Sequence, residues 1–305
     1  MRRDLVKRRL GGLGQDMTSP GIPVFAYGGE TIAPFRGKLS IWAGLSIVGA
    51  MLALSDRGWL VAGGIVLLGL MYAHGLELMH QCVHGAAFRD PAWNRAVGTV
   101  LGLPVLYAFS DYRAKHLDHH RLLGTPGNDD VVAFATMSAA ARYFAMVPHF
   151  RQTVRTMLRA LGQLAMDRFP IRARLARPLI QDYSLIAAFL AAMIAGAWFA
   201  PRLVTMLWLL PLAIAVPVHA ALDLVAHWRC ASVGAPTVTT RTIETGLLGR
   251  WFTNGNNFHV EHHLWPDLPP EMLRHAHRGS QPDCAPRGAS YATLLFRLFF
   301  TEKRI

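Results

Sequence analysis

The chain contains little cysteine and few charged residues. Cysteine occurs at only 3 of 305 positions, too few and too scattered for a disulfide scaffold or a closed zinc site. Charged residues make up 16% of the sequence, against about 25% in ordinary soluble domains. Hydrophobic residues reach 52%, and the mean hydropathy is +0.26. This composition excludes a disordered chain and a coiled coil, and it argues against an ordinary soluble enzyme.

Charge is absent from four long apolar stretches, each near the length of about 20 residues that a bilayer requires. Only one or two charged residues separate the members of each pair, so each pair should form a tight hairpin. We therefore predict an all-α integral membrane fold with four transmembrane helices in two hairpins. The predicted spans are residues 40–55, 58–78, 183–201 and 203–225.

The rest of the chain divides around these spans. Residues 96–109 are apolar but too short to cross a bilayer and contain Pro104, which favours a re-entrant or interfacial segment. Residues 1–39 form a cytoplasmic tail. Residues 110–182 and 226–305 are predicted to form a cytoplasmic helical cap that holds a metal site.

The chain has 31 basic and 19 acidic residues, a formal charge of +12. Among the basic residues, only Arg57 and Arg202 lie at the hairpin tips, so the positive-inside rule places both termini in the cytoplasm. This bias and contact with anionic membrane lipid explain the charge without a nucleic-acid partner. No cleavable signal peptide is expected, and the excess of arginine over lysine suggests a bacterial inner membrane.

Histidine is abundant, with 14 residues, and most of it falls into three clusters. On a helix, positions i, i+3 and i+4 share a face, so each cluster should aim two or three imidazoles at one point. The second span should end near residue 78, which brings the first cluster to the cytoplasmic surface beside the others. This pattern predicts metal binding rather than isolated core histidines. The clusters are His80 and His84; His116, His119 and His120; and His259, His262 and His263.

Eight imidazoles exceed the ligands that one ion takes, so two ions are expected. The lack of thiolates argues against iron–sulfur clusters and structural zinc. Imidazole suits iron, copper and zinc. A nitrogen-rich site for two metals beside an apolar membrane space favours non-haem iron that activates dioxygen. Zinc would serve hydrolysis. Hydrolysis would need a carboxylate that activates water, and the sequence offers no obvious one outside the clusters.

His227 at the end of the fourth span is predicted as a ninth ligand. It follows His219 and Asp223 on one helical face, with Asp223 as its expected partner. His219 lies about two turns deeper, where it lines the substrate cavity or, as we prefer, packs against a neighbouring helix. His74, in the second span, is interpreted in the same way.

Several acidic residues lie beside the histidines and are expected to orient them by accepting the second ring N–H. Two are within clusters, two follow the second cluster, and one precedes His80 by one turn. The remaining histidines are expected at the surface. The acids are Asp118, Glu261, Asp129, Asp130 and Glu77, and the surface histidines are His149, His275 and His277.

The cluster sequences HGAAF (84–88), KHLDHHRLLG (115–124) and NFHVEHHLWP (257–266) carry a resemblance beyond their spacing. Together they resemble the boxes of the membrane fatty-acid desaturase and hydroxylase superfamily, including sphingolipid desaturases. The resemblance covers residues 76–273. One departure is Gln81, because the first box of this superfamily often carries an acid directly after its first histidine.

The resemblance implies two iron ions held by the box histidines and His227, with dioxygen as co-substrate. It also implies an asparagine before the third box that assists through water, for which Asn254, Asn256 and Asn257 are candidates. No fused haem-binding segment is expected. Electrons should therefore come from a separate ferredoxin- or cytochrome-type protein that docks on the basic cytoplasmic face.

The implied reaction is desaturation of an acyl-lipid through iron-oxo hydrogen abstraction. Hydroxylation or ketolation of an alkyl, sphingolipid or carotenoid substrate is the alternative, since loss of a second hydrogen gives an alkene and oxygen rebound gives an alcohol. A non-enzymatic metal carrier is a remote alternative. A carrier would place ionisable residues through the spans, whereas here they gather at one face.

Overall fold

The structure is a computed structural model that describes residues 32–126, 146–166, 173–277 and 289–300. Every regular element in these ranges is helical, apart from one isolated bridge between Thr242 and Phe258. The predicted all-α class is therefore confirmed for the described part of the chain. Asp129 and Asp130 lie outside it.

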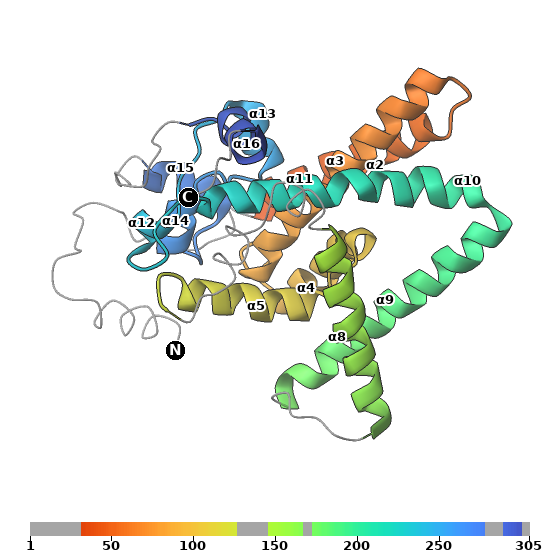
Figure 1. The fold of residues 1–305 in the computed structure, drawn as a ribbon, viewed down its shortest axis with the longest axis horizontal. Helices are drawn as coiled ribbons and strands as arrows, with labels where there is room; N and C mark the ends of the chain where they lie inside the picture. The colour runs from red at the N-terminus through yellow and green to blue at the C-terminus, as the bar shows by residue number, and fades with distance from the viewer. Residues whose placement is uncertain (1–31, 127–145, 167–172, 278–288, 301–305) are drawn as a thin grey trace.

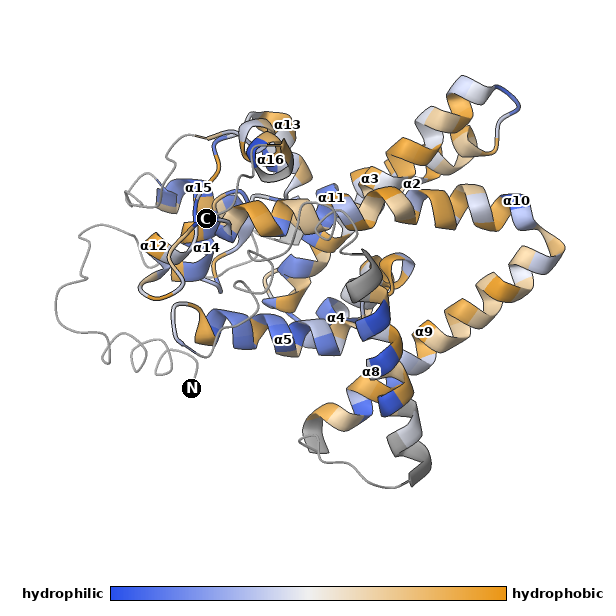
Figure 2. Cartoon of the chain, viewed as in Figure 1, coloured by the Kyte–Doolittle hydropathy of each residue, from blue (hydrophilic) through white to orange (hydrophobic). Residues whose placement is uncertain are grey.

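The helices divide into long ones that project to one side and short ones gathered at the other (Figure 1). Figure 2 shows that the projecting helices are largely hydrophobic, whereas α5 is mostly hydrophilic. The elements are α2 (Ile32–Ala53), α3 (Gly58–Val83), α4 (Pro91–Gly102), η1 (Leu103–Val105), α5 (Phe109–Leu122), α8 (Met146–Met166), α9 (Ala173–Phe199), α10 (Pro201–Val204), η2 (Thr205–Leu209), α11 (Leu210–His227), α12 (Pro236–Thr239), α13 (Leu247–Phe252), α14 (His259–Leu264), α15 (Pro270–His277) and α16 (Tyr291–Phe300).

Three helical stretches are long and apolar enough to cross a membrane: Gly58–Val83, Leu175–Phe199 and Pro201–His227. The first continues past the predicted end at residue 78 and so includes His80. The span predicted at residues 40–55 overlaps α2, which begins at Ile32, ends at Ala53 and carries Arg36 and Lys38 near its start. Its charge-free part is short, so a fourth crossing stays a prediction. Residues 96–109 form the end of α4, the turn η1 and the start of α5.

Helices α2 and α3 approach one another through small residues. A Cβ atom on Gly64 would lie 2.3 Å from the backbone nitrogen of Ala53 and 2.7 Å from the carbonyl oxygen of Gly49. Small residues allow membrane helices to pack backbone to backbone, where dispersion contacts replace the missing hydrophobic driving force. The predicted first hairpin is thus present as a tightly packed pair.

The helix that ends at His227 is irregular near its middle. Pro211 has no N–H to donate to the carbonyl of Leu207, and the preceding residues form the π-helical turn η2. The hydroxyl of Tyr72 on α3 donates to that carbonyl at 2.6 Å. Such a partner matters because an unsatisfied carbonyl in hydrocarbon is costly. This bond also joins α3 to the η2–α11 helix.

The start of α5, the helix of the second histidine cluster, is held by a carboxylate from α9. Asp182 is buried and accepts from the backbone N–H of Ser110 at 2.7 Å, near the positive end of the α5 dipole. Its other oxygen lies 2.6 Å from a guanidinium nitrogen of Arg95 on α4. One carboxylate therefore fixes three helices around the cap.

Asp182→Ala is expected to lower the free energy of unfolding by about 3 kcal/mol, because it breaks a largely buried ion pair and leaves the α5 start without an acceptor. Thermal unfolding in detergent would measure the change. Asp118→Ala is the control, since Asp118 pairs with Arg121 at the exposed surface, where such pairs are worth up to about 1 kcal/mol. Equal effects of the two variants would contradict the assigned role of Asp182.

Candidate metal centre

The first histidine cluster occupies the end of α3. His80 and His84 lie one turn apart, and the helix closes at Gly85, whose φ of +70° is the left-handed conformation typical of a helix C-terminus. The carbonyl of Val83 accepts from Nε of Arg113 on α5 at 3.0 Å. This bond brings the first and second clusters together.

Nine histidines from four helices converge into two groups, and the second and third clusters each divide between them. Adjacent positions on a helix point about 100° apart, so His119 and His120 cannot face the same point, nor can His262 and His263. Each cluster therefore aims two imidazoles at one group, as expected, while the third member of the second and third clusters faces the other group. The first group is His80, His84, His116, His120 and His262, and the second is His119, His227, His259 and His263.

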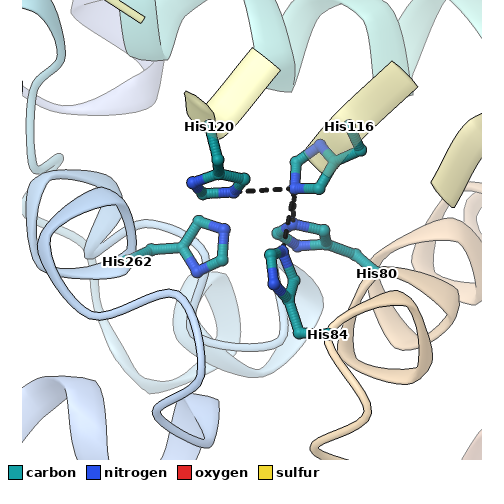
Figure 3. Close-up of side chains that lie close together, drawn as sticks. All are labelled: His80, His84, His116, His120 and His262. Carbon is teal, nitrogen blue, oxygen red and sulfur yellow. Dashed lines mark hydrogen bonds between the residues drawn. The ribbon is translucent and has the colours of Figure 1, made fainter. Parts of the chain in front are cut away.

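In the first group, the imidazoles crowd around the Nε2 atom of His116 (Figure 3). This atom lies 2.7 Å from Nε2 of His80 and 2.9 Å from Nε2 of both His84 and His120. One ring nitrogen carries either one proton or one lone pair, so three hydrogen bonds cannot form there. His262 closes the group, with its ring centroid 4.6 Å from that of His80.

In the second group, Nε2 of His259 lies 2.9 Å from Nε2 of His227 and 3.1 Å from Nε2 of His263. The ring of His119 lies 5.0 Å from that of His227. The two groups adjoin, since the rings of His120 and His263 are 4.2 Å apart.

The donor set fits metal ions. Nitrogens that bind one ion at about 2.1 Å come within about 3 Å of one another, as they do here. Among the described residues, Nε2 of His262 is buried without a hydrogen-bond partner. Burial first, and then neighbouring imidazoles, lowers the pKa of His116, His262 and His263 well below 6.5. These rings are therefore neutral at pH 7, and their lone pairs can bind a metal.

Two histidines of the second group have identifiable partners for their other ring nitrogen. Nδ1 of His259 lies 2.9 Å from Oδ1 of Asn256, and Nδ1 of His227 lies 3.2 Å from the carbonyl oxygen of Thr239. Such partners fix the orientation and tautomer of a ligating ring. The carbonyl of Thr239 was not predicted, because a backbone acceptor leaves no signal in the sequence.

Three asparagines were candidates before the third cluster, and only one of them bonds to His259. Asn254 instead donates to Oε1 of Gln81 at 3.0 Å and accepts from Lys38. Asn257 donates to the carbonyl of Ile243 at 3.0 Å. Asn256 is thus the asparagine that reaches the histidine groups.

Two of the acids predicted to orient histidines have other roles. Asp118 points to the surface, where it is 62% exposed and pairs with Arg121. Asp223 lies 3.4 Å from Nε2 of His219, not beside His227. The predicted roles of Asp118 and Asp223 were wrong for the same reason. Helical spacing shows which residues share a face, but it does not show which neighbouring helix that face contacts.

Glu261 is fully buried within the third cluster. It accepts from the hydroxyl of Thr242 and lies 2.7 Å from Nδ1 of His277. His277 was expected at the surface, but this contact makes it a half-buried link between α14 and α15. His275 is exposed, as predicted. The side chain of His149 lies outside the described residues.

The two histidines inside the spans differ. His74 packs as expected, with its ring 4.3 Å from that of Trp251 and Nδ1 2.7 Å from the carbonyl of Phe252. His219 does not merely pack. Its Nδ1 lies 3.3 Å from Oε1 of Glu77, and its Nε2 faces Asp223.

Comparison with known proteins identifies the chain's relatives. The family model described as fatty acid desaturase matches residues 57–295. A delta(8)-fatty-acid desaturase of Euglena gracilis is 24% identical over 77% of this chain and 64% of its own. An acyl-lipid 8-desaturase of Rebecca salina is 28% identical over 78% of this chain and 58% of its own, so this chain spans less than two thirds of both relatives. A human sphingolipid delta(4)-desaturase is 34% identical over 28% of each chain. Because the family model covers most of the sequence, including all three histidine clusters, the chain belongs to the fatty acid desaturase family.

Proposed function

We propose that the protein is a dioxygen-dependent lipid desaturase with two non-haem iron ions. The observation that carries this proposal is the pair of adjacent groups of buried and half-buried imidazoles, which two apolar helices, α3 and α11, help to build, in a chain of the desaturase family. The first group would hold one ion and the second group the other. Bound iron would supply dioxygen activation and removal of hydrogen from an unactivated C–H bond.

The protein's own residues contribute position and exclusion of water. His259, Glu261 and His262 are each no more than 5% exposed, so the third histidine cluster lies away from bulk solvent. Asn256 and the carbonyl of Thr239 hold two rings with Nε2 directed inward. A fixed, dry site favours reaction at one carbon of a bound chain.

The substrate we propose is the acyl chain of a lipid. The named relatives act on fatty acids, acyl-lipids and sphingolipids, and the three apolar helices suit a substrate that resides in the bilayer. Electrons would come from a ferredoxin- or cytochrome-type donor. Because the basic residues avoid the hairpin tips except at Arg57 and Arg202, we also propose that both termini and all the histidine groups face the cytoplasm.

Expression of the chain in a lipid-producing host, followed by mass spectrometry of the lipids, tests this function. The expected product has lost two hydrogens and gained one double bond, and it should be absent with His262→Ala. A product that gains oxygen without a double bond would identify a hydroxylase instead. Unchanged lipids with a fully metal-loaded protein and a working electron donor would contradict both enzymatic functions.

A further inference from the structure

A line of polar side chains runs through the helix bundle and ends at the second histidine group. Oδ2 of Asp223 lies 3.4 Å from Nε2 of His219, whose Nδ1 lies 3.3 Å from Oε1 of Glu77. The other oxygen of Glu77 accepts from Nδ2 of Asn256 at 3.2 Å. Oδ1 of Asn256 lies 2.9 Å from Nδ1 of His259. The line joins α11, α3 and the segment before α14.

Which atom donates and which accepts can be assigned along this line by starting from His259. Its Nε2 faces His227 and His263, so its proton belongs on Nδ1, which donates to Oδ1 of Asn256. The amide is then oriented with Nδ2 toward Glu77, because only the amide nitrogen can donate. Both ring nitrogens of His219 lie near carboxylates, at 3.3 and 3.4 Å, without hydrogen-bond geometry, so His219 belongs to the line as a positively charged ring in two ion pairs.

This charge has a physical consequence at Glu77. The Glu77 side chain is 1% exposed and that of His219 is 5% exposed, whereas that of Asp223 is 50% exposed. A buried carboxylate is stable only with charged or hydrogen-bonding partners. His219 supplies that partner, so Glu77 can stay ionised and accept from Asn256.

Two simpler explanations do not account for this arrangement. A packing histidine would resemble His74, which contacts aromatic rings and a backbone carbonyl. A further metal ion could gather Glu77, His219 and Asp223, since one donor atom from each lies within 4.8 Å of the others. It would not account for the contact of Glu77 with Asn256, which leads on to His259.

We propose that Glu77 and His219 are positioning residues for His259. Through Asn256 they fix the orientation and tautomer of its ring, and so determine how firmly the second histidine group retains its metal ion. The first histidine group does not depend on them. This inference rests on the proposed function, since it concerns the metal centre of that function.

The test is release of iron from the purified full-length chain to an excess chelator, followed over time. His219→Gln and Glu77→Gln are each expected to speed release of one of the two ions by about 10–100-fold, the usual cost of removing an outer partner. Release of the other ion should not change. His74→Gln is the matched control, a buried span histidine outside the line, and should leave both rates unchanged.

A double substitution separates positioning from general destabilisation. Asn256→Ala breaks the line, so adding His219→Gln to it should cause no further acceleration, whereas independent effects would multiply. Should His219→Gln fail to fold, Asp223→Asn at the half-exposed end serves in its place, with a smaller acceleration that also vanishes beside Asn256→Ala. Unchanged release in the single variants, multiplicative effects, or equal loss of both ions would overturn the inference. An unaltered chain that binds no iron would contradict the proposed function and with it this inference.

Discussion

His116→Ala is expected to remove the metal ion of the first histidine group and to abolish turnover. Nε2 of His116 lies within 2.9 Å of Nε2 of three other histidines, so no other residue replaces it at the centre of that group. Since loss of an outer partner alone costs about 10–100-fold, loss of a ligand should exceed about 100-fold in activity. Elemental analysis of the purified protein would measure the metal, and lipid analysis the turnover.

Lys115→Ala is the matched control for this prediction. Lys115 is the preceding residue on α5, is 54% exposed and pairs with Asp111 on the same helix. Its loss should leave metal content and membrane insertion unchanged. A single zinc ion per chain that persists in His116→Ala would sink the assignment of two iron ions.

His227→Ala is expected to release the metal ion of the second histidine group and to reduce activity by more than about 100-fold. Nε2 of His227 lies 2.9 Å from Nε2 of His259, and Nδ1 is held by the carbonyl of Thr239. His227 contacts the second group and not the first. Its loss should therefore leave the first group's ion in place. Metal content and lipid products measure the two effects.

His275→Ala, an exposed histidine on α15, is the control and should behave like the unaltered protein. Full metal content and full activity in His227→Ala would make His227 a packing residue. The ligand set would then have to be completed by another residue, with Asn256 the first candidate because it already contacts His259.

Local spacing accounted for much of the candidate site. Histidines three and four residues apart share a helical face, so the eight box histidines could be identified without any knowledge of the fold. Charge-free length predicted three helices that are long and apolar enough to cross a membrane, whereas the charged first turns of α2 shorten its apolar part. The position of His227 at the end of an apolar helix sufficed to propose it as a ligand. Each of these inferences depends on residues close together in the chain.

Contacts between distant segments could not be inferred in this way. The division of the second and third clusters into two groups depends on how α3, α5, α11 and α14 face one another. The choice of Asn256 over its neighbours, the pairing of Asp223 with His219, and the exposure of Asp118 depend on the same packing. Sequence spacing defines the angle of a side chain about its own helix axis. The partner that it meets is set by helices packed from elsewhere in the chain, and therefore only by the tertiary structure.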